Sequence, residues 1–228
     1  MIQHIPYQQL GHEDYGWLNT HYHFSFANYF HPNRMGHGAL RVLNEDRIAP
    51  QSGFDMHPHK DMEIISVIRQ GSITHKDSEG NVGRTMAGDI QVMSAGTGIV
   101  HSEHNLENES THMFQIWIRP KTKGLRPQWA QSHYEYDTDN GLQLLVAGDN
   151  SAPLHINQAA KIYLGQLSTA NVCIETVAKY AYLVVFEGSL GVNGLIAHSG
   201  DGVAVTDEAQ LSMEAVTQTQ FLLISLEV

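Results

Sequence analysis

Short runs of strand-forming residues, each closed by a glycine or aspartate turn, recur along the whole 228-residue chain. Residues 62–68 read Met-Glu-Ile-Ile-Ser-Val-Ile, and residues 113–118 read Met-Phe-Gln-Ile-Trp-Ile. Both runs are rich in β-branched or aromatic side chains, whereas amphipathic helical periodicity is scarce. Short strands separated in this way predict an all-β fold of antiparallel sheets, arranged as a sandwich or a barrel.

The strand pattern appears twice in outline. Residues 182–188 (Tyr-Leu-Val-Val-Phe-Glu-Gly) echo residues 63–71, and the Gly-Asp turn at 200–201 echoes the one at 88–89. Between the two halves, residues 120–139 contain prolines, a glycine and polar residues, as a connector does. We therefore predict two domains, residues 1–130 and 131–228, the second being a degenerate duplicate kept for structure.

Charge and cysteine content narrow the class of protein. The formal net charge of −11 disfavours nucleic acid and anionic membranes as partners. Cys173 is the single cysteine, so a reducing compartment is expected. The first residues lack the features of a signal peptide, and the apolar runs are too short to span a bilayer. We expect a cytoplasmic protein, and a monomer because no long apolar edge is evident.

Two pairs of chemically active residues stand at strand spacing. His57 and His59 lie two residues apart, as do His101 and Glu103, and such residues point to one face of a strand. Two pairs brought together would offer three imidazoles and a carboxylate to a metal ion such as Fe, Mn, Ni, Cu or Zn. Glu63 has the same parity as His57 and His59, so the spacing leaves open which glutamate completes the set.

The other histidines are interpreted as structural. His21 and His23 also share a face, but no nearby carboxylate completes a ligand set. His75 and His112 are expected to be ordinary strand histidines, and His104 to face outward. The alternation in residues 23–26 (His-Phe-Ser-Phe) predicts a half-buried strand.

These motifs resemble a known superfamily. His57-Pro58-His59 with Glu63, then Gly88-Asp89 and His101 with Asn105, resemble the two motifs of the cupins. Residues 94–103 and 23–26 resemble the pirin family within it, and the closer match is to the bacterial pirin-like quercetinases. The likeness covers essentially the whole chain. It implies two cupin barrels (double-stranded β-helix, or jelly roll) in one chain, a bicupin in which only the first barrel binds metal.

The resemblance also implies a ligand set, which is His57, His59, His101 and Glu103. The loop before His101 is two residues longer than in cupins generally, which fits the pirin arrangement and favours Glu103 over Glu63. Glu63 would then lie behind the ligands as a buried hydrogen-bonding partner. The implied cofactor is one divalent transition metal, with Fe(II) expected and with Mn, Ni, Cu, Co or Zn able to replace it in purified samples.

The activity implied is that of a dioxygenase acting on flavonols such as quercetin, with release of carbon monoxide. A small aromatic chelating substrate and dioxygen are then the partners, and Glu103 is the candidate catalytic base for the flavonol 3-hydroxyl. Apolar residues are expected to line the substrate pocket, and the candidates are Phe26, Phe54, Met56, Met93 and Phe114. The alternative is a non-enzymatic protein that senses metal or redox state and binds a regulatory partner protein, as described for eukaryotic pirins.

Overall fold

The computed structural model describes residues 1–134 and 141–228, and nearly all of its regular structure is β-strand. The described residues form two compact units. The first unit comprises residues 11–134 and 154–158, and the second comprises residues 1–10, 141–153 and 159–228. Residues 135–140, at the end of the expected connector, lie outside the described residues. The division at residues 130 and 131 stays a prediction, whereas the compact units are discontinuous in sequence.

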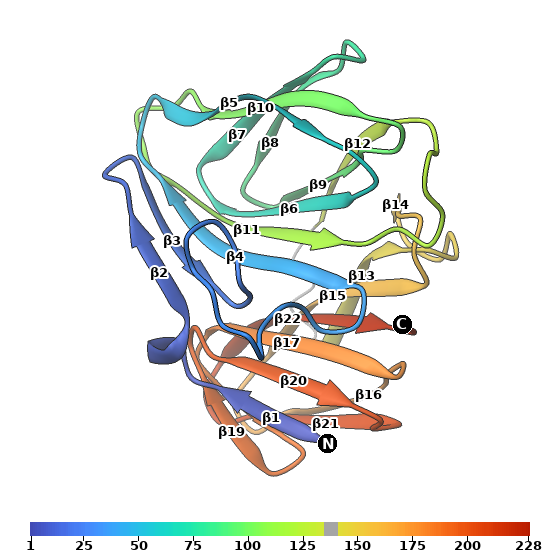
Figure 1. Cartoon of the computed structure of the whole chain (residues 1–228). Coiled ribbons are helices and arrows are strands. Elements are labelled where there is room, and N and C mark those ends of the chain that lie inside the picture. The colour runs from blue at the N-terminus through green and yellow to red at the C-terminus, as the bar shows by residue number, and fades with distance from the viewer. Residues whose placement is uncertain (135–140) are drawn as a thin grey trace. The chain divides into compact units, whose positions relative to one another are not determined.

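The first unit holds two antiparallel sheets, with strand orders β12-β9-β6-β11-β4-β3-β2 and β5-β10-β7-β8. Figure 1 shows the second of these sheets lying over β6 and β11. The strands are β2 (Gly11–Asp14), β3 (Leu18–Tyr22), β4 (Leu40–Ile48), β5 (Ser52–His59), β6 (Glu63–Gln70), β7 (Ser72–Asp77), β8 (Val82–Met86), β9 (Asp89–Ser94), β10 (Ile99–Asn105), β11 (Thr111–Ile118) and β12 (Gln128–His133). The segment 154–158 adds β14 (Leu154–His155).

The central strand β6 shows why this sequence forms a sheet. Its residues from Glu63 to Ile68 are all buried, and Gly71, with φ 73°, turns the chain into β7. A run of β-branched side chains suits a strand covered on both faces. Small apolar clusters fill part of the space between the sheets, one of them around Ile68, Ile73 and Met113.

The strand expected over residues 23–26 does not form. β3 ends at Tyr22, and the chain enters a loop in which Ser25 Oγ donates to His31 O and accepts from His31 N, both at 2.9 Å. Ala27 then adopts φ 49°. The side-chain hydrogen bond of Ser25 closes a turn where a partner strand would be needed.

The second unit repeats the two-sheet plan. One sheet contains β1-β20-β17-β22-β15-β13 in that order, and the other is β16-β21-β18-β19. Their bounds are β1 (Ile2–Ile5), β13 (Gly141–Ala147), β15 (Ala160–Leu167), β16 (Val172–Thr176), β17 (Tyr180–Glu187), β18 (Ser189–Val192), β19 (Leu195–His198), β20 (Gly202–Thr206), β21 (Gln210–Ala215) and β22 (Thr219–Leu226). A short 3-10 helix, η1 (Tyr7–Gln9), follows β1. The predicted all-β fold is confirmed.

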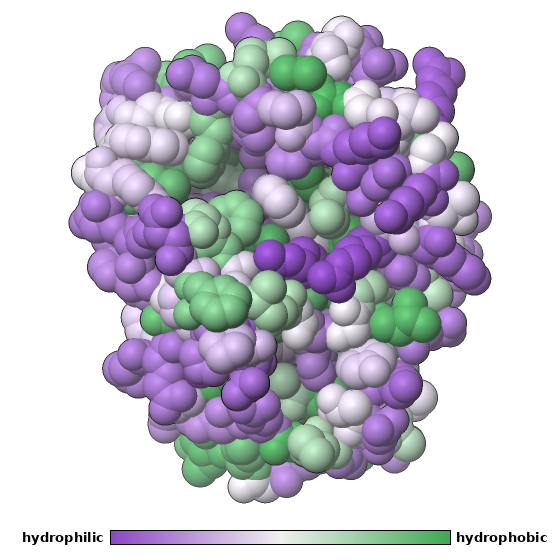
Figure 2. All heavy atoms as spheres, in the orientation of Figure 1, coloured by the Kyte–Doolittle hydropathy of each residue, from purple (hydrophilic) through white to green (hydrophobic). Residues whose placement is uncertain are grey.

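The face of the molecule drawn in Figure 2 is predominantly hydrophilic. Figure 2 shows polar residues over much of the visible face, interrupted by separate hydrophobic patches. In the described parts of the chain, no helix combines the length and the apolar character needed to cross a bilayer.

Candidate metal centre

Two neighbouring strands of the first unit bring three histidines together. β5 and β10 pair in antiparallel register with His101 opposite His57, and His59 follows two residues after His57 on the same face. One ring nitrogen from each of the three histidines lies within 4.8 Å of the others. His101 is buried, whereas His57 and His59 are half-buried, so the cluster opens toward β5.

The hydrogen bonds of His57 show that this cluster suits a cation. Its Nδ1 lies 2.7 Å from Asp55 O, and a carbonyl oxygen can only accept. A neutral His57 therefore carries its proton on Nδ1 and presents the Nε2 lone pair to His101 Nε2, which is 3.0 Å away. Two imidazole nitrogens bound at about 2.1 Å to one ion, at a right angle, are about 3 Å apart. The residues fit a divalent transition metal.

Two of the three histidines, His59 and His101, are in the uncharged form that a metal ion binds. Burial, with the neighbouring His101 and His57 rings, lowers the pKa of His59 to about 4. Burial and the rings of His57 and His75 lower the pKa of His101 to about 3. Both rings are therefore neutral at pH 7, as a metal ion requires of its imidazole ligands.

Glu103 follows two residues after His101 on β10, next to an irregularity in the pairing of β10 with β5. Between His101 and Glu103 the register with β5 shifts, so that Glu103 lies opposite Phe54. Gly53 permits this close approach, because a Cβ there would lie 2.3 Å from Glu103 O. Glu103 forms a second potential ligand group with His75 and His101, and it is not within the first group.

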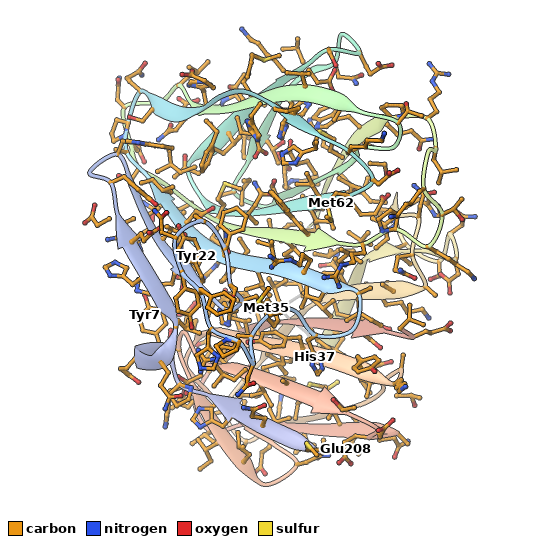
Figure 3. The ribbon with its side chains drawn as sticks, viewed as in Figure 1. Tyr7, Tyr22, Met35, His37, Met62 and Glu208 are labelled. Atoms are coloured by element: carbon orange, nitrogen blue, oxygen red, sulfur yellow. The ribbon has the colours of Figure 1, made fainter. Side chains whose placement is uncertain are left out.

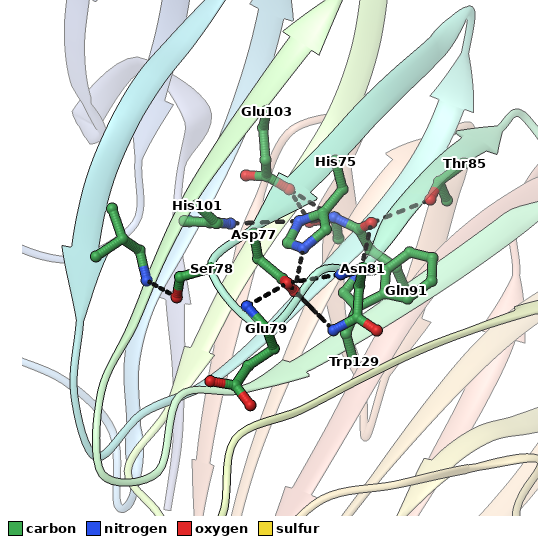
Figure 4. A network of polar contacts seen from close by, with 12 residues as sticks. His75, Asp77, Ser78, Glu79, Asn81, Thr85, Gln91, His101, Glu103 and Trp129 are labelled. Carbon is green, nitrogen blue, oxygen red and sulfur yellow. Dashed lines mark hydrogen bonds and ion pairs between the residues drawn. The ribbon is translucent and has the colours of Figure 1, made fainter.

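Three neutral donors hold the buried carboxylate of Glu103. Oε1 accepts from Gln91 Nε2 at 2.5 Å and from Ser66 Oγ at 3.2 Å, and Oε2 accepts from Gln115 Nε2 at 2.7 Å. Gln91 is itself oriented, because its Oε1 accepts from Trp129 Nε1 and Thr85 Oγ1. These contacts, several of which appear in Figure 4, fix the carboxylate without a countercharge.

The remaining candidates lie away from the two ligand groups. Glu63 is buried and accepts from Ser94 Oγ at 2.5 Å and Asn157 Nδ2 at 3.2 Å. His21 stacks on the ring of His12 with centroids 4.4 Å apart, and His23 is fully buried. His104 Nε2 lies 3.3 Å from Asp55 Oδ1, and His112 Nε2 lies 2.7 Å from Glu45 Oε1.

Comparison with known proteins identifies the chain. The family model "Pirin" matches residues 4–118, and the model "Quercetinase C-terminal cupin domain" matches residues 144–226. This protein belongs to the pirin family. The predicted resemblance, including two cupin domains, is confirmed.

Relatives align along nearly the full chain. A pirin-like protein of Caulobacter vibrioides is 43% identical over 98% of this chain and 99% of its own. The quercetin 2,3-dioxygenase of Escherichia coli K12 is 40% identical over 95% and 94%. The crystal structure of the bacterial pirin YhhW of Escherichia coli in complex with nickel(II) has a TM-score of 0.94 and 38% identity, covering 99% of both chains.

The five residues expected to line a pocket occupy different environments in this pirin. Phe26 and Phe54 are half-buried, and Met56 is 56% exposed. Met93 and Phe114 are buried in the core. Phe114 adjoins Gln115, which contacts Glu103, and neighbouring strand residues point to opposite faces, so Phe114 lies on the other face of β11.

An aromatic residue outside that set adjoins the centre. The ring of Trp117 lies edge-on to His59, with centroids 4.8 Å apart, and it also contacts Phe26 at 5.3 Å. Phe26 packs in turn on Tyr22, which is labelled in Figure 3. Trp117 lies two residues after Gln115 on β11 and therefore on the same face of the strand. This spacing is the sequence signal that could have placed Trp117 near the centre.

Proposed function

We propose that this pirin is a metal-dependent dioxygenase that cleaves flavonols such as quercetin and releases carbon monoxide. The observation that carries the proposal is the half-open cluster of three histidines, in which His57 Nε2 faces His101 Nε2 across 3.0 Å beside a buried glutamate. The full-length relative named quercetin 2,3-dioxygenase and the nickel(II) complex of a pirin neighbour support it.

The proposed ligands of one divalent ion are His57, His59, His101 and Glu103, with Fe(II) as the native metal. When bound, the ion acts as a Lewis acid on the deprotonated flavonol oxygen and orients substrate and dioxygen. The three imidazoles offer lone pairs without adding charge. Burial of His101 and Glu103 excludes water from the inner side of the centre.

Glu103 is the proposed base for the flavonol 3-hydroxyl. Oε1 already accepts from two donors, whereas Oε2 accepts from Gln115 alone and keeps capacity for a further proton. Trp117 and Phe26, whose rings pack edge to face, supply apolar surface next to His59, suited to an aromatic ring system.

The function is tested by loading the full chain with Fe(II) anaerobically, adding quercetin and air, and following flavonol absorbance, oxygen uptake and carbon monoxide. We expect metal-dependent loss of the flavonol with carbon monoxide as a product. Tight Fe(II) binding with no turnover of any chelating enol would contradict the enzyme assignment and favour the metal-sensing alternative.

Exchanging each of the two glutamates for glutamine separates their roles. Glu103→Gln should lower kcat per bound metal by about 100-fold or more, because a positioned base contributes that much. The matched Glu63→Gln variant should retain bound metal and turnover, since Glu63 contacts Ser94 and Asn157 rather than the ligand group. Full turnover by metal-loaded Glu103→Gln would refute the assignment of the base.

A further inference from the structure

A fourth histidine, His75, lies next to His101 on the side away from His57, and Asp77 lies beyond His75. His101 Nδ1 is 3.4 Å from His75 Nδ1, and His75 Nε2 is 2.9 Å from Asp77 Oδ2. The side chains of His75 and Asp77 are both 0% exposed. Trp129 stacks on the His75 ring, with centroids 5.2 Å apart and planes 13° from parallel, which fixes the plane of the ring (Figure 4).

Asp77 is held as an acceptor. Its Oδ1 accepts from the backbone N–H groups of Glu79 and Asn81 at 3.0 and 2.9 Å, and Asn81 Nδ2 donates to Oδ2 at 2.9 Å. Burial raises the pKa of Asp77, but the hydrogen bonds from His75 and Asn81 outweigh it and hold the pKa below its ordinary value. The ionised carboxylate requires a donor at His75 Nε2.

The direction of each hydrogen bond from Asp77 through His75 to His101 can now be worked out. When His101 offers its Nε2 lone pair to a metal ion, its single ring proton is on Nδ1, which donates to His75 Nδ1, and His75 donates from Nε2 to Asp77. On its other side, His101 Nε2 faces the lone pair of His57 Nε2. A neutral His101 has one ring proton, which can serve its contact with His75 or its contact with His57 but not both. With that proton on Nδ1, a metal ion can occupy the space between the two Nε2 lone pairs.

We propose that Asp77 and His75 are positioning residues that fix His101 in the tautomer whose Nε2 lone pair faces the metal. The proposal rests on the metal centre of the proposed function, but not on its substrate. Outer hydrogen bonds to ligating histidines orient the ring and raise its basicity, and their loss typically weakens metal binding about 10- to 100-fold.

The sharpest test is Asp77→Asn. The two backbone donors at Oδ1 require the amide carbonyl to stay there, which turns the amide NH₂ toward His75 Nε2. His75 must then donate from Nδ1 and His101 must accept, which leaves the wrong tautomer at the metal; an amide in place of an orienting carboxylate acts in this way elsewhere. We expect the Ni(II) affinity of the full chain, measured by chelator competition, to fall about 10- to 100-fold.

His75→Phe gives the second variant, because a phenyl ring can keep the stacking on Trp129 while removing both hydrogen bonds. It should weaken Ni(II) binding by a similar factor, and Asp77→Asn should add nothing in the His75→Phe background. If Asp77 instead acted on the metal through its charge alone, Asp77→Asn would weaken Ni(II) binding further in the His75→Phe protein. Such additive losses would overturn the proposal.

Asp89→Asn is the matched control. Asp89 pairs with His133 at 2.7 Å in the same unit and contacts no histidine of the centre, so Ni(II) affinity should be unchanged. The NMR spectrum of the Zn(II)-loaded wild type should show a slowly exchanging, hydrogen-bonded His101 Nδ1–H proton, and in Zn(II)-loaded Asp77→Asn and His75→Phe this proton should exchange faster because its acceptor is lost. Wild-type Ni(II) affinity in both Asp77→Asn and His75→Phe would overturn the proposal. If both variants lose affinity as expected but the metal-loaded wild type does not turn over flavonols, only the proposed function is refuted.

Discussion

Asp46 of β4 is a buried carboxyl group that feels the charge of Glu103, and it makes the stability of the metal-free protein depend on pH. Its Oδ1 accepts from Thr20 Oγ1 at 2.5 Å. Burial raises the pKa of Asp46 to about 7, and although the Thr20 hydrogen bond lowers it, the charges of Glu103 and Glu45 raise it further. The folded state therefore binds this proton more tightly than the unfolded state. Its contribution to stability is complete below about pH 4 and is lost as the pH rises through about 7.

Asp46→Asn should remove this dependence, because the amide keeps a partner for Thr20 and carries no charge. The free energy of unfolding of the variant, relative to wild type, should rise by about 2 kcal/mol between pH 5 and pH 8. Denaturant unfolding of both metal-free proteins at several pH values measures this, and contributions shared by the two proteins, such as those of His59 and His101, cancel. A difference that stays constant over this range would show that Asp46 ionises normally.

The residues of the centre were predictable to different degrees. His57, His59 and His101 follow from two-residue spacing on strands. The choice between Glu63 and Glu103 does not, because Glu63 shares the parity of His57 and His59 only if the strand is unbroken. In the structure β5 ends at His59 and β6 begins at Glu63. The expectation that His75 is an ordinary strand histidine misses its contact with His101, because that contact depends on the pairing of β7 with β10, which no local pattern encodes.

At the scale of elements, the repeated Gly-Asp turn marks equivalent strands. Asp89 opens β9 and pairs with His133 of the edge strand β12, while Asp201 precedes β20 and pairs with His4 of β1 at 2.8 Å. β12 neighbours β9, and β1 neighbours β20, in corresponding sheets. The sequence echo predicted the turn, and the strand runs at 63–68 and 182–186 predicted β6 and β17. The repeated pattern could not predict that β1, at the N-terminus, forms the edge strand beside β20, since the paired residues are about two hundred positions apart in the sequence.

Asp201 should therefore determine how firmly β1 is attached. Its carboxylate accepts from His4 Nε2, Tyr7 N and His198 N, all at 2.8 or 2.9 Å. Asp201→Ala should lower the stability of this attachment by roughly 3 kcal/mol, because hydrogen bonds to a buried charge are lost. Hydrogen exchange should accelerate in β1 and remain slow in β22. Equal acceleration in both strands would indicate global destabilisation rather than release of one strand.

At the scale of the whole molecule, the two units use the same architecture for different interiors. The second unit packs a continuous apolar core that includes Leu183, Val185 and Phe221, whereas the first places histidines, glutamines and Glu103 between its sheets. Among the described residues, both potential ligand groups belong to the first unit. The duplication was visible in the sequence as repeated strands and turns, whereas the second half contains no second His-x-His. That only the first unit binds metal stays a prediction.

This division predicts one metal ion per chain and separable effects on binding and stability. Leu183→Ala should cost about 2 to 5 kcal/mol of unfolding free energy, because it leaves a cavity in a fully buried core. Its Ni(II) stoichiometry should stay at one and its affinity should equal that of wild type, since the proposed ligands all belong to the first unit. His101→Ala should show the converse, losing the stabilisation of about 2.7 kcal/mol that Ni(II) gives at a hundred times its Kd. Calorimetric titration and metal-dependent thermal unfolding measure both effects, and two bound equivalents per chain would place a second site in the apolar unit and contradict this division.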